Sequence, residues 1–284
     1  MTPRPLPGEL RAFAEDPGAF VTIGPDEERI LTDRYSVTFT PGEHYWSALV
    51  QRLRFGTDDV AGGVAEIRGL VAEHGRGAAA WAVGPSATPA GLLELLVAMG
   101  MQAESDAGSL MLVLTEPPHI QGSWLEVRLV TSYEDHVAAI EVANQGFAFP
   151  SEDALDERRR ALTSFRSERA GGHSVRLLAV DRGRPVAAGR AWFAPLGLYL
   201  GGGATLPLER RRGAMSAVVA RAWDRPWTVG RRRWSRLVGR WPRRACSGWA
   251  FVRSVGCGTW SIGPTAELVL DQGPAVGERS GTRA

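Results

Sequence analysis

Apolar positions recur along the chain with two different periods, and their alternation outlines a fold. Residues 60–74 carry apolar side chains three and four positions apart, which predicts an amphipathic helix. The apolar run at 78–83 predicts a buried strand, and 109–114 predicts another. Between these strands, Thr88 is expected to cap a helix over residues 89–99.

The second half of the chain repeats this type of pattern more completely. Strands are expected at 125–130, 175–180, 185–193 and 198–206, and helices at 133–144, 152–168 and 214–223. Ser132 and Ser151 are expected to cap the first two of these helices. The triplet Gly201–Gly203 inside a strand predicts a bulge or a close backbone approach. This order predicts an α+β fold (α/β layered), with a mixed, mostly antiparallel sheet flanked by helices.

One segment combines features that suit a phosphate group. After the glycine triplet, Arg210, Arg211 and Arg212 precede Gly213, and a helix follows directly. The start of a helix offers unpaired N–H groups and the positive end of its dipole, and a glycine lets a ligand come close to the backbone. The segment therefore predicts an anion site suited to a pyrophosphate. The alternative is a solvated arginine cluster beside an ordinary helix.

This segment resembles the GNAT superfamily of acetyl-CoA-dependent N-acetyltransferases. The residues that match are Thr205-Leu206-Pro207, followed by Arg210-x-x-Gly213-x-Met215 at the start of a helix. The family pattern is Gln/Arg-x-x-Gly-x-Gly/Ala, so Met215 departs from it at the last small position. The preceding strand, two helices and hairpin also follow the family order, and the resemblance covers about residues 124–224.

The resemblance implies that acetyl-CoA binds here as a substrate and that its acetyl group passes to an amine. Ala204, Thr205 and Leu206 would bind the pantetheine arm through their backbone. The residues that would surround the pyrophosphate are Arg210, Arg211, Arg212, Gly213, Ala214, Met215 and Ser216.

The transfer also needs groups that move protons. Glu141 is a candidate base and Tyr199 a candidate acid, and the alternatives are a solvated glutamate and a tyrosine at the edge of the core. We expect His173, in a Gly-Gly-His-Ser turn, to lie on the surface. The sequence shows no zinc-ligand spacing, so no metal is expected.

The first part of the chain resembles the same superfamily in degenerate form. Its helix at 92–99, Gly100-Met101 and strand at 109–114 resemble the helix–Leu-Gly-Phe–strand ending of GNAT domains, but no arginine–glycine loop follows a strand. The expected fold is therefore a tandem pair of GNAT-like domains. Residues 1–118 would form the degenerate copy and residues 119–224 the part that binds acetyl-CoA.

Composition limits the class of protein. With 44 % hydrophobic and 23 % charged residues, two cysteines, no apolar run of membrane-spanning length and no apolar stretch behind Met1, the chain is expected to be a cytoplasmic protein without membrane association. We expect a monomer or a homodimer. All 33 basic residues are arginine, which indicates a GC-rich gene.

The charge distribution changes this picture for the last 60 residues. Residues 1–224 hold 22 arginines and 28 acidic residues, whereas residues 225–284 hold 11 arginines and three acidic residues. Residues 225–260 contain five tryptophans and both cysteines, and no helix or strand period is evident there. Arginine interleaved with tryptophan suits nucleic acid, and a membrane-surface segment is a rarer alternative.

The interpretation we favour is that the irregular tail at 225–284 is a frameshift product. One permitted back-translation of residues 234–262, read in a second frame, encodes a stretch with helical spacing, a glycine cap and an alternating strand. The sequence encoded in that frame resembles the missing fifth strand, last helix and final strand of a GNAT domain. The second domain would then be incomplete at its C-terminus, with low activity and a poorly ordered tail. The rival function is a non-catalytic module, which either senses a ligand or binds nucleic acid through the tail.

Overall fold

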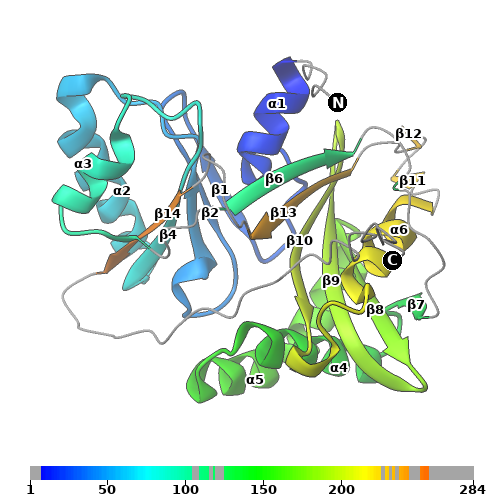
Figure 1. Cartoon of the computed structure of the whole chain (residues 1–284). Coiled ribbons are helices and arrows are strands. Elements are labelled where there is room, and N and C mark those ends of the chain that lie inside the picture. The colour runs from blue at the N-terminus through cyan, green and yellow to red at the C-terminus, as the bar shows by residue number, and fades with distance from the viewer. Residues whose placement is uncertain are drawn as a thin grey trace, which may run out of the picture.

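The computed structural model describes residues 8–103, 109–114, 118, 125–224, 228–229, 232–233, 237–242 and 250–255. Two six-stranded sheets lie beside each other, each with helices packed on it (Figure 1). In the described residues the helices are α1 (Gly8–Glu15), α2 (Val60–Glu73), α3 (Leu92–Ala98), α4 (Tyr133–Phe147), α5 (Ser151–Gly171) and α6 (Ala214–Asp224). Short 3₁₀ turns lie at Pro17–Ala19, Tyr45–Ser47, Thr57–Asp59 and Pro207–Glu209.

The first sheet has the order β1-β2-β3-β4-β14-β5. Its strands are β1 (Glu28–Leu31), β2 (Ser36–Phe39), β3 (Ala48–Gln51), β4 (Ala78–Val83), β5 (Gln102–Ala103) and β14 (Ala250–Val255). Helices α2 and α3 cover this sheet. The apolar face of α2 is the predicted one, and its Val64 and Ile67 belong to the same buried cluster as Trp81 of β4. The predicted helix at 60–74 and the predicted strand at 78–83 are both confirmed.

The predicted cap of α3 is wrong. Thr88 does not start the helix: its backbone forms a bridge to Arg54, and its hydroxyl donates to the carbonyl oxygen of Phe55 at 3.0 Å. The helix instead begins at Leu92, behind Gly91 in the left-handed region at φ 78°. Local capping chemistry favours Thr88 as a cap, but its actual partners lie more than 30 residues away in the chain.

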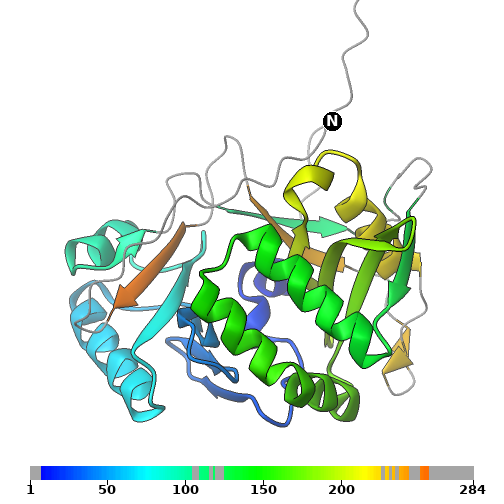
Figure 2. The same cartoon turned by 90° about the horizontal axis from the view of Figure 1, so that it is seen from below.

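The second sheet has the order β6-β13-β10-β9-β8-β7. Its strands are β6 (Ser109–Leu114), β7 (Glu126–Leu129), β8 (Ser174–Asp181), β9 (Arg184–Ala194), β10 (Gly197–Thr205) and β13 (Leu237–Pro242). Helix α6 packs on one face through Val218, which is fully buried with Leu177 and Leu200. The other face packs on α4, and Figure 2 shows α4 and α5 (green) lying across it. The sheet is mixed, because β10 and β13 are parallel and the other neighbours are antiparallel.

Local signals in this half are largely confirmed. The Ser132 side chain caps α4 by accepting from the backbone N–H of Asp135 at 3.1 Å. Arg182 and Gly183 have positive φ angles in the turn between β8 and β9, as this tight hairpin requires. The expected cap at Ser151 is wrong, since Pro150 occupies the cap position and has no side-chain hydrogen bond to offer.

The two sheets exchange strands. Strand β6 follows the first unit in sequence but pairs antiparallel with β13 in the second sheet. Strand β14 follows the second unit but pairs with β4 and β5 in the first sheet. The N-terminal helix α1 also packs on the second unit, where Leu10 and Phe13 contact Ala194. Strand pairing therefore links the parts of the chain before and after residue 118, and the domain boundary there stays a prediction.

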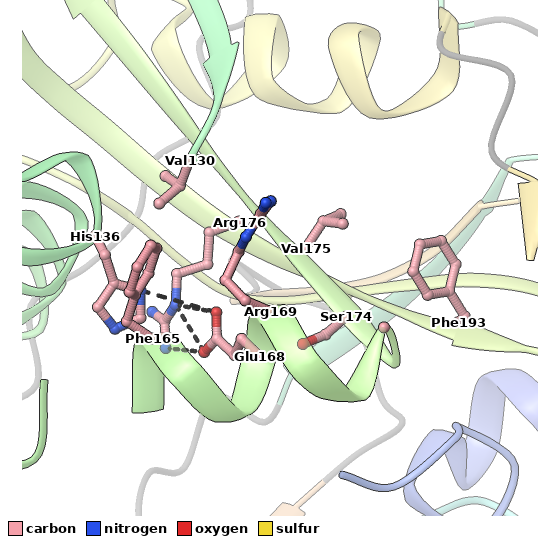
Figure 3. A pocket seen from close by; sticks show the side chains of 10 residues that line it. Val130, His136, Phe165, Glu168, Arg169, Ser174, Val175, Arg176 and Phe193 are labelled. Carbon is pink, nitrogen blue, oxygen red and sulfur yellow. Dashed lines mark hydrogen bonds and ion pairs between the residues drawn. The ribbon is translucent and has the colours of Figure 1, made fainter. Parts of the chain in front are cut away.

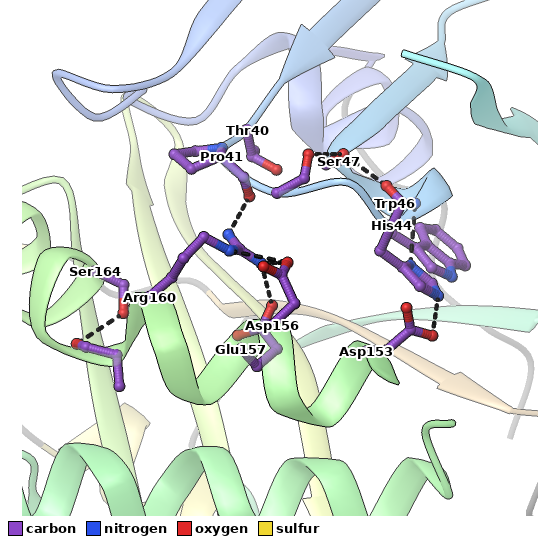
Figure 4. Close-up of polar contacts among 12 residues, drawn as sticks. Thr40, Pro41, His44, Trp46, Ser47, Asp153, Asp156, Glu157, Arg160 and Ser164 are labelled. Carbon is purple, nitrogen blue, oxygen red and sulfur yellow. Dashed lines mark hydrogen bonds and ion pairs between the residues drawn. The ribbon is translucent and has the colours of Figure 1, made fainter. Parts of the chain in front are cut away.

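Polar contacts also join the two units (Figure 4). Arg160 of α5 donates to the carbonyl oxygen of Pro41 at 2.7 Å. His44 Nε2 lies 3.6 Å from a carboxylate oxygen of Asp153, at the start of α5. Helix α5 thus rests against the segment that follows β2 in the first unit.

The segment after Asp224, for which an irregular tail stays a prediction, contains four of the described strands. It contains β11 (Thr228–Val229) paired with β12 (Arg232–Arg233), as well as β13 and β14. Strand β13 occupies the place beside β10 where the fifth strand was expected to be missing. Pattern alone did not reveal β13 and β14, because both strands pair with distant parts of the chain. Burial of Trp234, Trp241 and Trp249 in one core would contradict the frameshift, and these side chains lie outside the described part of the chain.

Among the described residues, no helix is both long and apolar enough to span a bilayer.

Candidate functional site

Strand β10 carries the predicted bulge. Its register with β9 shifts between Gly201 and Ala204, within the glycine triplet. Strand β13 pairs with β10 only at Leu198, Tyr199 and Leu200. Among the described strands, none pairs with this edge of β10 from residue 201 to 205. Peptide groups along such an open edge are available to an extended ligand that binds like an added strand.

The loop after β10 is anchored by its own charged side chains. Glu209 is buried, and its carboxylate accepts hydrogen bonds from Arg184 and Arg212. Arg210 donates to the carbonyl oxygen of Gly146 at the end of α4, at 2.7 Å. Two of the three predicted phosphate-binding arginines, Arg210 and Arg212, therefore hold the loop in shape, although Arg212 is exposed, as Arg211 also is.

The start of α6 is open toward this loop. Gly213 has a φ of 75°, and no atom lies within 4 Å of the position that a Cβ would take there. The first hydrogen bond of the helix runs from the N–H of Ala217 to the carbonyl oxygen of Gly213 at 2.9 Å. The N–H groups of Ala214, Met215 and Ser216 precede that bond, so they have no acceptor within the helix. Together with the helix dipole they form a position for an anion.

Met215 is the residue that departs from the family pattern. A Cβ at Gly203 would lie 3.0 Å from its sulfur and methyl group, so the Met215 side chain rests on the bulge. It also packs against the core under α6. The long side chain is thus accommodated on the sheet side of the helix by the absence of a side chain at position 203.

Tyr199, the predicted acid, lies beside the bulge. Its ring stacks on Trp192 of β9 with centroids 5.4 Å apart. Its hydroxyl group lies 2.9 Å from the position that a Cβ would take at Gly201. With the phenol in this position, only glycine fits at residue 201. The role of Tyr199 as the acid stays a prediction.

Glu141, the predicted base, has a different environment. Arg158 of α5 donates to both of its carboxylate oxygens, one of them at 2.6 Å. That hydrogen bonding lowers the pKa of Glu141. The residues of α4 that face the second sheet are Ala139 and Val142, and Glu141 lies on the side of the helix toward α5. The structure does not bring Glu141 together with Tyr199.

A buried polar cluster that the sequence pattern did not indicate lies next to the bulge. Arg190 lies opposite Gly201 in the register of β9 and β10. Its guanidinium donates to the hydroxyl of Ser174 at 3.0 Å and lies 3.2 Å from His173 Nε2. Carboxylate oxygens of Glu168 and Glu27 are 3.5 and 3.9 Å away. An arginine in the middle of the mostly apolar β9 was the available signal.

The expectation that His173 lies on the surface is wrong. Only 2 % of the residue is exposed, because Gly24 and Gly171 pack directly on its ring. Burial, together with the charge of Arg190, lowers its pKa. The Gly-Gly-His-Ser turn indicated exposure, but the segment from residue 24 to 27 of the first unit covers it.

A cavity of about 150 Å³ lies at the outer side of this cluster, between α5 and β8 (Figure 3). Arg176 holds Glu168 there through three hydrogen bonds of 2.8 to 3.0 Å. His136 is fully buried beside them, with Nε2 2.8 Å from the hydroxyl of Ser164. Since that hydroxyl donates to the carbonyl oxygen of Ala161, it accepts from His136 Nε2–H. In the described parts of the chain, no group of three or more metal-ligating side chains is found.

Comparison with known proteins identifies the fold. No family model and no curated protein sequence matches the chain. A GCN5-related N-acetyltransferase from Kribbella flavida is similar in structure with a TM-score of 0.56 at 18 % identity, covering 82 % of this chain and 91 % of that one. One from Sphaerobacter thermophilus gives a TM-score of 0.51 at 15 % identity, covering 82 % and 84 %.

A conserved protein of unknown function from Staphylococcus epidermidis gives a TM-score of 0.54 at 13 % identity, covering 81 % of this chain and 95 % of that one. The three similarities extend over most of both chains. The chain therefore has the fold of the GCN5-related N-acetyltransferases, which confirms the predicted fold class.

Proposed function

We propose that the protein transfers an acetyl group from acetyl-CoA to an amine, and that the second unit binds acetyl-CoA. The observation that carries this proposal is a single continuous feature. The edge of β10 from Gly201 to Thr205, which no described strand pairs with, leads directly to the open helix start behind Gly213. An extended arm that ends in a pyrophosphate matches a strand edge followed by an anion position.

In this proposal the backbone does most of the binding. Ala204 and Thr205 bind the pantetheine arm, and the N–H groups from Arg211 to Ser216 bind the pyrophosphate. The third residue predicted for the arm, Leu206, already has its N–H on Val186 and its carbonyl oxygen on the N–H of Glu209. Arg211 adds charge from the solvent side, while Arg210 and Arg212 keep the loop in position through Gly146 and Glu209. The thioester then lies near Gly201, beside the hydroxyl of Tyr199.

The reaction needs few protein groups. The neutral amine attacks the carbonyl carbon of the thioester, the carbon–sulfur bond breaks, and the amine nitrogen loses one proton to water. Tyr199 donates a proton to the leaving thiolate and regains one from solvent. Glu141 has no part in this scheme, since Arg158 occupies both of its oxygens.

The first unit is proposed to have no acetyl-CoA site, and its local charge supports this. The corresponding helix α2 is preceded by Asp58 and Asp59 in the turn at Thr57–Asp59. Carboxylates at the start of a helix compete for the position that a phosphate would need. The single site per chain would then be that of the second unit, and the two units would form a tandem pair.

The test is the release of free thiol from acetyl-CoA by the purified chain in the presence of a panel of primary amines. The proposal predicts amine-dependent release together with formation of the N-acetyl product, seen by mass spectrometry. Saturable binding of acetyl-CoA without product from any amine would favour the rival, a module that senses the ligand. Absence of both binding and product would reject the proposed function.

A further inference from the structure

Three aromatic and cationic groups form one stack beside the bulge. The guanidinium carbon of Arg190 lies 4.6 Å from the ring centroid of Trp192. On the next strand, Tyr199 stacks on Trp192 with an angle of 28° between the ring planes. The Tyr199 hydroxyl ends this stack against Gly201. Arg190 is therefore connected to the phenol through a single ring.

The far end of the stack is fixed by residues from two parts of the chain. Glu168 comes from α5, and Glu27 comes from the segment before β1 in the first half of the sequence. Glu27 is held in turn, because its other carboxylate oxygen accepts from the backbone N–H of Gly24 at 2.7 Å. Side chains of both acids are about 10 % exposed, so their attraction to Arg190 is little screened by solvent.

We propose that Arg190 is a positioning residue, which Glu27 and Glu168 hold in place and which orients Tyr199 over the bulge through Trp192. The cation lies over the face of the Trp192 ring and fixes its tilt. An offset aromatic pair then transmits that tilt to the phenol. This inference rests on the proposed function for its effect on turnover, and on geometry alone for its effect on Tyr199.

It also gives the first half of the chain a role in the second-unit site. Glu27 lies far from β9 in sequence, and it contributes the carboxylate that the first unit brings to Arg190. Loss of Glu27 should therefore have the same kind of effect as loss of Arg190, but a smaller one, because Glu168 remains.

The simpler alternative is that Arg190 only stabilises the fold, and the chain offers a matched control for it. Arg176 is the direct neighbour of Arg190 on β8 and binds the same Glu168. Arg176 lies one strand further from β10 than Arg190, and its guanidinium donates to the carboxylate of Glu168. A purely structural role predicts similar consequences for Arg190→Met and Arg176→Met.

The experiment has two readouts on the full-length chain. The first incorporates 3-fluorotyrosine and follows its ¹⁹F NMR signals. The chain has four tyrosines, and Tyr199→Phe identifies the signal of Tyr199. We expect Arg190→Met to shift or broaden that signal, Arg190→Lys to restore most of it, and Arg176→Met to leave it in place. Glu27→Gln serves as a milder variant if Arg190→Met does not fold.

The second readout is a double-mutant cycle in steady-state acetyl transfer. Arg190→Met should lower kcat by about tenfold while the Kd of acetyl-CoA changes less than about twofold, since the backbone contacts that bind it are retained. In the Tyr199→Phe background the same substitution should cause no further loss.

The two readouts separate the possible failures. An unchanged Tyr199 signal in both Arg190→Met and Glu27→Gln, or a loss of kcat that adds fully to that of Tyr199→Phe, would overturn the positioning role. Equal effects of Arg176→Met would overturn it as well. If the unsubstituted chain transfers no acetyl group, the proposed function fails, and the NMR signal alone decides whether Arg190 orients Tyr199.

Discussion

The hydroxyl group of Tyr199 lies against Gly201, at 2.9 Å from the point where a side chain at position 201 would begin. The phenol can extend along the strand only because that side chain is absent. It therefore reaches the bulge, where β10 loses its pairing with β13. This relationship gives the proposed acid a fixed place beside the proposed thioester.

Replacement of Tyr199 by phenylalanine should affect chemistry and not binding. We expect kcat for acetyl transfer to fall by roughly 100-fold, since a general acid contributes at least that much, with the Kd of acetyl-CoA nearly unchanged. Tyr133→Phe is the control, because Tyr133 is 38 % exposed on α4. Steady-state kinetics and calorimetry provide both values. An unchanged kcat would remove Tyr199 from the mechanism.

Replacement of Glu141 by glutamine should leave turnover unchanged. Arg158 binds both carboxylate oxygens and lowers the pKa of Glu141, so the group is a poor base. The pair is partly exposed, and we expect the substitution to cost at most about 1 kcal/mol of unfolding free energy. A loss of kcat by about 100-fold without loss of stability would restore Glu141 as the base.

Acid should destabilise the protein in two stages. Burial and the charge of Arg176 lower the pKa of His136 to about 4. The unfolded chain takes up this proton near pH 6.5. The contribution of neutral His136 to the unfolding free energy is therefore complete above that pH and is lost as the pH falls toward 4. Burial opposes ionisation of Glu168, yet Arg176 and Arg190 lower its pKa to about 2. The contribution of ionised Glu168 to the unfolding free energy is lost between about pH 4.5 and 2.

Urea denaturation at several pH values tests the first stage. We expect the unfolding free energy to fall by about 2 kcal/mol between pH 7 and pH 4.5 on account of His136. His136→Gln retains an N–H donor for Ser164 and should flatten this dependence. An equally steep fall in His136→Gln would show that another group is responsible.

The gene offers a direct test of the tail. We predict that the nucleotide sequence after codon 224 holds a second open frame, which encodes a helix, a glycine cap and an alternating strand. A chain continued in that frame should be more soluble and more active. Stop codons in that frame within about 30 codons would refute the frameshift, and β13 would then stand as the true neighbour of β10.

Local patterns were sufficient for most elements that form from neighbouring residues. The helix of Val64 and Ile67, the β8–β9 turn and the bulge after Gly201 depend on periodicity or on glycine, and all three occur where the sequence predicted them. What the sequence did not reveal depends on distant partners. Thr88 bonds Phe55 instead of capping a helix, and His173 is covered by Gly24.

The same distinction applies to the site. The open helix start behind Gly213 follows from local chemistry, but the uses of the arginines do not. Arg210 and Arg212 are occupied by Gly146 and Glu209, partners that the motif alone cannot indicate. The role of Arg190 was likewise hidden, since its place beside Gly201 results from strand register.

The most direct test of the acetyl-CoA site is calorimetric titration of Gly213→Val with acetyl-CoA. A side chain at 213 meets no protein atom, so its effect on binding would come from the space that a phosphate would occupy and from the strain of a positive φ. Gly100→Val is the matched control, with φ 86° and equally open surroundings. We predict that Gly213→Val weakens binding at least tenfold and that Gly100→Val leaves it unchanged. Equal affinities for the two variants and the unsubstituted chain would contradict the site.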